Sequence, residues 1–134
     1  MKKALLIVLC ITLLFSATAC SSYVSSYKAF MLVRTERGDH GSISFSSFEG
    51  TYVMKLKMSG EGQEGSILCR ASLEEGEINV YYDFLGVKEF LFNLKAGESI
   101  DERRGYIESG KTVYIIIETV TPAKEGKVSI DFRK

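Results

Sequence analysis

The stretch SILCRASLEEGEINVYYDF, residues 66–84, carries the period that decides the fold. Apolar and polar side chains alternate along residues 66–73 and again along residues 77–84. Because successive side chains of a β-strand point to opposite faces of a sheet, each segment is expected to have one buried and one solvent-facing side. The positions expected to be buried are Ile67, Cys69, Ala71, Leu73, Ile78, Val80, Tyr82 and Phe84.

The same alternation recurs elsewhere in the chain. It is clear in residues 51–58 and 127–133, and shorter strand candidates lie at residues 29–35, 43–45 and 87–94. No window shows a convincing helical period with caps, so little helix is expected. A chain made of several short alternating segments is typical of a β-sandwich or a β-barrel.

Residues 113–119 are β-branched and apolar on both sides, which predicts a strand at the centre of a sheet. Turns containing glycine or proline are expected between the strands, among them Glu75-Gly76 and the segment from Thr121 to Gly126. The sequence therefore predicts an all-β fold, an antiparallel two-sheet sandwich with jelly-roll-like connectivity. A small antiparallel barrel is the alternative.

Residues 1–19 are expected to be an export signal. Lys2 and Lys3 precede an apolar run at residues 4–15, and residues 17–19 (Ala-Thr-Ala) are the small residues typical of a cleavage site. A helix of this apolar length would reach roughly 18 Å. Because the hydrocarbon core of a bilayer is about 30 Å thick, the run is too short for a permanent membrane span.

Cys20 follows these small residues, and the arrangement resembles the lipobox of bacterial lipoproteins. In that family a peptidase cuts before the cysteine, whose sulfur carries a diacylglyceryl group, so the resemblance implies lipidation of Cys20. The family prefers Leu three places earlier, where this chain has Ala17. An ordinary signal peptidase would cut the same bond and leave Cys20 unmodified, so both outcomes stay open.

The expected organisation has three parts: a lipoprotein signal peptide at residues 1–19, the lipidated cysteine and a short tether at residues 20–27, and a β-sandwich domain at residues 28–134. Tyr23 and Tyr27 could equally belong to the first strand. A protein of this design is exported and anchored on the outer side of the cytoplasmic membrane or in an outer membrane, with the membrane as its partner through the lipid.

Charge and cysteine content narrow the class of protein. The chain has 17 Lys and Arg against 17 Asp and Glu, and removal of residues 1–19 would leave 115 residues with 15 basic and 17 acidic side chains. A nucleic-acid binder usually has a basic excess, so no nucleic-acid partner is expected. Cys69 would be the only cysteine left besides Cys20, so no internal disulfide is expected.

A second resemblance lies near the C-terminus, in SGKTVYIIIETVTPAKEGKVSIDF, residues 109–132. The segment resembles the C-terminal hairpin of jelly-roll modules in exported bacterial proteins, such as prepeptidase C-terminal and carbohydrate-binding modules. The resemblance implies that Gly110 opens a strand and that Tyr114 packs across the sandwich. Upstream, LEEGEINVYYDF, residues 73–84, resembles part of small Gram-positive lipoproteins. Neither resemblance brings catalytic or ligand-binding residues.

Few residues can support catalysis or metal binding. His40 is the only histidine, and it is expected in a solvent-facing loop where Asp39 could orient it. Cys69 lies on the apolar side of its segment and is expected to be a core residue. The acidic residues at 74–77 and at 101–102 are expected in solvated turns and an ion-paired surface loop. No catalytic residue, metal ligand or cofactor is therefore predicted.

The remaining hypothesis is a binding role. Tyr81 falls on the solvent-facing side of its strand and could belong to an aromatic platform, although most other aromatic residues fall on core-facing positions. We expect a non-catalytic binding module for a surface glycan or an envelope protein. The alternatives are a small envelope inhibitor or assembly factor acting through a loop or an edge strand, and, less favoured, a hydrolase.

Overall fold

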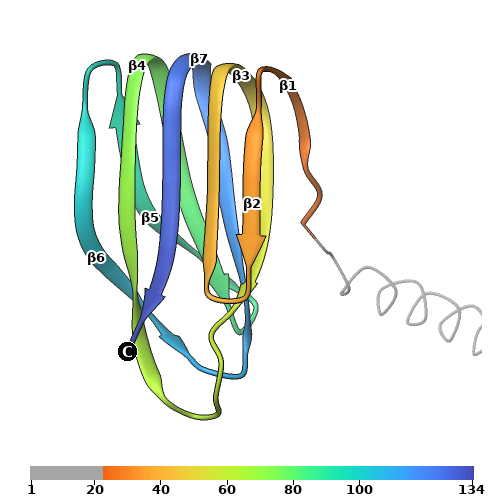
Figure 1. Ribbon diagram of the computed structural model, residues 1–134, viewed down its shortest axis with the longest axis vertical. Helices are drawn as coiled ribbons and strands as arrows, with labels where there is room; N and C mark the ends of the chain where they lie inside the picture. The colour runs from red at the N-terminus through yellow and green to blue at the C-terminus, as the bar shows by residue number, and fades with distance from the viewer. Residues whose placement is uncertain (1–22) are drawn as a thin grey trace, which may run out of the picture.

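The computed structural model describes residues 23–134, which form seven antiparallel strands and contain no helix (Figure 1). The predicted signal peptide and Cys20 lie outside these residues, so both stay predictions. Within residues 23–134 no helix has the length and hydropathy to span a bilayer. The strands are β1 (Ser26–Phe30), β2 (Val33–Arg37), β3 (His40–Lys57), β4 (Glu64–Phe84), β5 (Val87–Lys95), β6 (Ser99–Glu108) and β7 (Thr112–Arg133).

Three strands are unusually long: β3, β4 and β7 have 18, 21 and 22 residues. Each bends once, near Gly50, Gly76 and Pro122, and the registers shift at these points. At the bend of β4, Gly76 has φ 92°, and a Cβ there would lie 2.3 Å from the carbonyl oxygen of Pro122. Only glycine permits this close approach of two backbones.

The bends correct one set of predicted turns. Glu75-Gly76 and the segment from Thr121 to Gly126 do not separate strands but lie inside β4 and β7. The same residue types serve both purposes, because a turn and a sharp strand bend need the same unusual backbone angles. The segment from Asp101 to Gly105, predicted as a loop, likewise lies inside β6, although its predicted ion pairing is present.

The bends fold one continuous sheet into two layers (Figure 1). The front layer has the order β2, β3 (residues 40–48), β7 (residues 123–133), β4 (residues 66–75) and β6. The rear layer has the order β3 (residues 51–57), β7 (residues 112–121), β4 (residues 77–84) and β5, while β1 pairs with β3 at its bend.

This strand order is that of a jelly roll. Each long strand contributes one half to each layer, so β3, β4 and β7 count as six strands, and with β5 and β6 there are eight. These eight strands interleave between the layers as two Greek keys. β1 and β2 are additions that pair with β3 at its edge. The predicted jelly-roll sandwich is therefore confirmed. The sheet ends in edge strands instead of closing on itself, so the alternative barrel is not formed.

The core lies between the layers and follows the predicted alternation. Every position predicted to be buried in residues 66–84 is buried except Phe84, which packs partly buried against the core. Residues 113–119 form part of the central β7, as predicted. Cys69 is fully buried, and burial raises the pKa of its thiol to about 12. A buried thiol of this kind acts as a small apolar side chain.

Candidate functional site

The outer surface of the rear layer carries three rows of side chains, which we call the aromatic face. Across β3, β7, β4 and β5 the strand registers align one polar row, one apolar row and one charged row. The polar row is Thr51, Glu118, Asn79 and Asn93; the apolar row is Val53, Ile116, Tyr81 and Phe90; the charged row, which includes one tyrosine, is Lys55, Tyr114, Asp83 and Lys88.

The apolar row is not part of the core. Val113, Ile115 and Ile117 point inward from β7, so Ile116 between them points outward, and yet only 1% of it is exposed. It is covered from outside the sandwich, where Val53 and Tyr81 are its partners on the neighbouring strands. A protected apolar row on an outer surface is not needed to form the sandwich core.

Phe90 joins this row through a β-bulge. The register of β4 against β5 shifts between Val80 and Tyr81, and Leu91 is the extra residue. Leu91 is buried, whereas Phe90 is 57% exposed and its ring meets that of Tyr81 edge to face at 5.9 Å. Strict alternation with the buried Phe92 would place Phe90 on the core side, but the bulge turns it outward. The outward position of Tyr81 agrees with its prediction.

Polar contacts fix the groups beside the aromatic rings. The amide of Asn93 donates to Glu77 at 2.8 Å and to the Asn79 side-chain oxygen at 2.9 Å. Lys88 reaches across the apolar row to Glu118, with 3.1 Å between Nζ and Oε1. On the way its Nζ lies 4.4 Å from the centre of the Tyr81 ring, so the lysine covers one face of that ring.

Tyr114 does not pack across the sandwich, which corrects its expected role. Its neighbours Val113 and Ile115 point inward, so Tyr114 points outward and meets the Tyr23 ring at 5.5 Å. Gly110 does lie in the turn just before β7, where its φ is 81°. The Tyr23 hydroxyl donates to Asp83, and this hydrogen bond, helped by burial and by the carboxylate charge, raises the pKa of Tyr23 to about 12.

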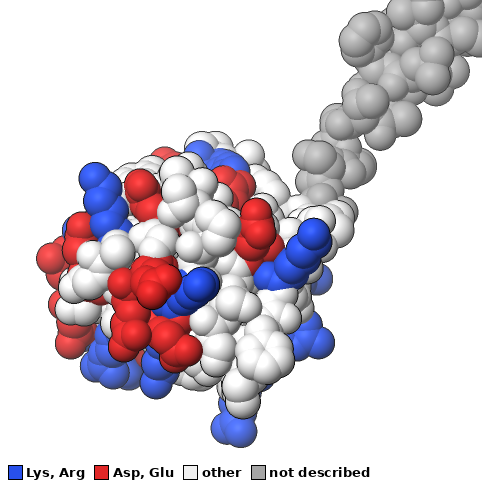
Figure 2. All heavy atoms as spheres, turned by 90° about the horizontal axis from the view of Figure 1, so that it is seen from above, with Lys and Arg blue, Asp and Glu red and all other residues white. Residues whose placement is uncertain are grey.

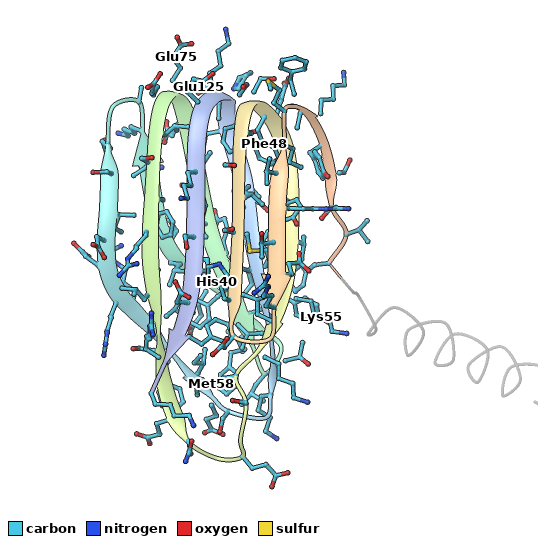
Figure 3. All side chains as sticks on the ribbon, in the orientation of Figure 1. His40, Phe48, Lys55, Met58, Glu75 and Glu125 are labelled. Atoms are coloured by element: carbon cyan, nitrogen blue, oxygen red, sulfur yellow. The ribbon has the colours of Figure 1, made fainter. Side chains whose placement is uncertain are left out.

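The outer surface of the front layer is different, and we call it the serine face: Ser42, Ser44, Ser72, Ser99 and Ser129. It contains a shallow hollow of about 400 Å³ between Arg70 and Lys127. Figure 3 labels His40 in the front layer and Lys55 in the rear layer.

His40 opens β3 and is not in a loop, and its partner is Asp131 and not Asp39, with 2.7 Å between Nδ1 and Oδ1. Within residues 23–134 no hydroxyl or thiol forms a hydrogen bond with His40, so this pair is not joined to a nucleophile. The same residues contain no group of three His, Cys, Asp or Glu side chains placed to hold a metal ion.

At the bend end of the sandwich, seen from above in Figure 2, acidic and basic side chains lie side by side, and Glu75 pairs with Lys124 at 3.8 Å.

Comparison with known proteins gives no family. No model of a known protein family matches the chain, and no curated protein matches it. Among solved structures, a family 29 carbohydrate-binding module in complex with mannohexaose is 16% identical, with 81% of this chain and 78% of that chain covered and a TM-score of 0.41. The cupin domain of Drosophila melanogaster CENP-C is 17% identical, covering 84% and 72%, with a TM-score of 0.31.

A third similar structure, dimeric latent PorU from Porphyromonas gingivalis, is 13% identical; 85% of this chain and 14% of that chain are covered, with a TM-score of 0.36. Likenesses this distant carry no argument about function. The fold assignment rests on the strand order of the protein itself.

Proposed function

We propose that this protein is a lipid-anchored envelope protein that binds a glycan on its aromatic face. The observation that supports this role is the row of Val53, Ile116, Tyr81 and Phe90 on an outer surface, where the fold itself needs no aromatic residues. Sugar rings present C–H faces that stack on aromatic rings, and Phe90 at 57% exposure offers such a surface.

The polar row supplies the complementary hydrogen-bonding groups. Glu118 offers carboxylate oxygens as acceptors. The Asn93 NH₂ is engaged by Glu77 and Asn79, so Asn93 can accept with its side-chain oxygen, while Asn79 can donate with its NH₂. Sugar hydroxyls also donate and accept, so a few fixed polar groups beside an apolar surface are suited to orient a saccharide. Because Glu118 in this row and Glu77, which is bonded to Asn93, both carry negative charge, a neutral glycan fits better than an acidic one.

The binding test compares the two faces. Processed protein purified in detergent would be titrated with neutral polysaccharides (mannan, glucan and chitin fragments) and with an acidic one (alginate). Phe90→Ala should weaken binding of the best neutral glycan about tenfold or more, as loss of one stacking contact predicts. Ser129→Ala, a matched change on the serine face, should leave binding unchanged. Equal effects of both changes would refute the assignment of the face.

The anchor is tested separately, by the mass of the mature protein. A diacylglyceryl group on Cys20 would support the lipid anchor, whereas a free thiol would show cleavage by an ordinary signal peptidase.

A protein partner is the second candidate, favoured by exposed apolar side chains at Leu85, Val87 and Phe90. Capture of a partner from native envelope that is lost in Phe90→Ala, together with no glycan binding, would select this function.

A further inference from the structure

The turn between β4 and β5 displays apolar side chains at a point where the backbone disfavours them. Phe84 pairs with Val87, so Leu85 and Gly86 form a two-residue turn with φ values of 61° and 84°. Turns of this kind usually contain Asn, Asp or Gly, because other side chains are strained at positive φ. Here the strained position holds a leucine that is 65% exposed, and Val87 beside it is 58% exposed.

One carboxylate connects this turn to the start of the described chain. Asp83 Oδ1 accepts the Gly86 N–H at 2.9 Å and so closes the turn. Its other oxygen, Oδ2, accepts the Tyr23 hydroxyl. The Tyr23 ring rests on Tyr114, and farther along the segment Ser25 Oγ accepts the Val53 N–H at 2.9 Å. The segment that enters the domain is therefore fastened beside the β4–β5 turn.

This fastening limits how far Cys20 can lie from the turn. Cys20 precedes Tyr23 by three residues, and an extended chain of that length spans about 11 Å. If the segment were free up to β1, which begins at Ser26, the six residues would span about 21 Å. A lipid on Cys20 is thus held close to the β4–β5 turn.

We infer that the tip formed by Leu85 and Val87 inserts into the lipid bilayer that holds Cys20, as a second membrane contact. This inference rests on the proposed lipid anchor. Exposed leucine and valine suit the acyl-chain boundary of a membrane, and the exposed Lys55, in the same row as Asp83, suits a lipid phosphate. The aromatic face then lies close to the membrane, with its charged row, which contains Asp83 and Lys88, nearest the bilayer.

The chain contains no tryptophan, so a single introduced tryptophan reports its own surroundings. Leu85→Trp would be placed at the tip, and Val120→Trp, at a valine that is 53% exposed in the described structure, would serve as control. Both proteins would be purified with their anchor and reconstituted in vesicles containing brominated lipids. We expect a blue shift and strong quenching for Leu85→Trp and neither for Val120→Trp. Equal, weak quenching of both would overturn the inference.

The lipid anchor on Cys20 and the insertion of the tip formed by Leu85 and Val87 are two separate hypotheses, and either can be wrong alone. If the mass shows an unmodified Cys20, its thiol would be coupled to a maleimide carrying one acyl chain; Cys69 is fully buried and should not react. The same quenching comparison then applies to the coupled protein.

A second variant removes the apolar tip without disturbing the turn. Leu85→Asn is compatible with positive φ, so it should fold as well as the wild type. A single acyl chain binds membranes only marginally and reversibly. On that tether, Leu85→Asn should dissociate from vesicles about tenfold faster than the wild type. Unchanged dissociation would count against the second membrane contact.

Discussion

The two outer faces of the sandwich are built from the same three strands and yet differ in composition. On the serine face, β3, β7 and β4 present Ser42, Ser129 and Arg70 side by side. On the aromatic face the same three strands, beyond their bends, present Val53, Ile116 and Tyr81.

The difference teaches what the fold demands and what it leaves free. Alternation determines which side chains enter the core, but it sets no requirement on the outward ones beyond compatibility with water. Serine meets that requirement on the front layer. The covered Ile116 and the exposed Phe90 go beyond it on the rear layer, and side chains that the core does not use are the ones available for binding.

The largest effect should come from breaking the bend that produces two faces from one sheet. Gly76→Ala would put a Cβ 2.3 Å from the Pro122 oxygen and 2.8 Å from the Ala123 Cα, at φ 92°. We expect a loss of about 3 kcal/mol or more, measured by urea unfolding. Gly97→Ala is the control, because Gly97 has a similar φ of 80° but no atom within 4 Å; it should cost about 1 kcal/mol. Equal losses would show that strain alone matters and that the close approach does not.

A smaller effect should separate the faces themselves. Ile116→Ala removes a covered side chain from the aromatic face and should cost about 2 kcal/mol. Ser129→Ala, at a partly exposed outward position of the same strand on the serine face, should change stability by less than about 0.5 kcal/mol. Thermal and urea unfolding of both variants would measure the difference. If Ile116→Ala were as mild as Ser129→Ala, the apolar row would contribute nothing to the sandwich.

The sequence alone was sufficient for the inward pattern but not for the bends. Ile67, Cys69 and Ala71 could be placed in the core because a period of two survives in any strand. The sequence does not predict that β4 continues through Gly76, because a glycine after two glutamates indicates a turn as readily as a bend within a strand. What decides between them is pairing with β7 on both sides of the bend, which is a tertiary contact.

The candidate site was predictable only at Tyr81, which follows simple alternation. Phe90 reaches the same row through a bulge, and one extra residue inverts every orientation that follows from alternation. The run Phe90-Leu91-Phe92, apolar on both sides, was the one local indication that this strand has two occupied faces. Tyr114 was assigned inward from a family resemblance, although its own neighbours Val113 and Ile115 fit the core better.

Apart from the control variants, the smallest predicted loss of stability concerns Tyr23, which fastens the entering chain to the aromatic face. Its hydrogen bond to Asp83 favours the neutral phenol and raises its pKa to about 12, compared with about 10 in an unfolded chain. A raised pKa means that the stabilisation is complete below pH 10 and is lost as the pH rises from about 10 towards 12. Tyr23→Phe lacks the hydroxyl and should lose about 1 kcal/mol at pH 7.

The pH dependence of that difference separates a real hydrogen bond from a change in packing. Tyr52 also has a pKa raised to about 12, chiefly by burial, so the wild type and Tyr23→Phe should share most of their alkaline destabilisation. The difference in melting temperature between them should therefore stay constant from pH 7 to pH 9 and shrink above pH 10. A difference in melting temperature that stays constant up to pH 11.5 would mean that packing of the Tyr23 ring on Tyr114 fastens the segment, and not the hydrogen bond to Asp83. The entering chain would then be joined to the aromatic face by stacking alone.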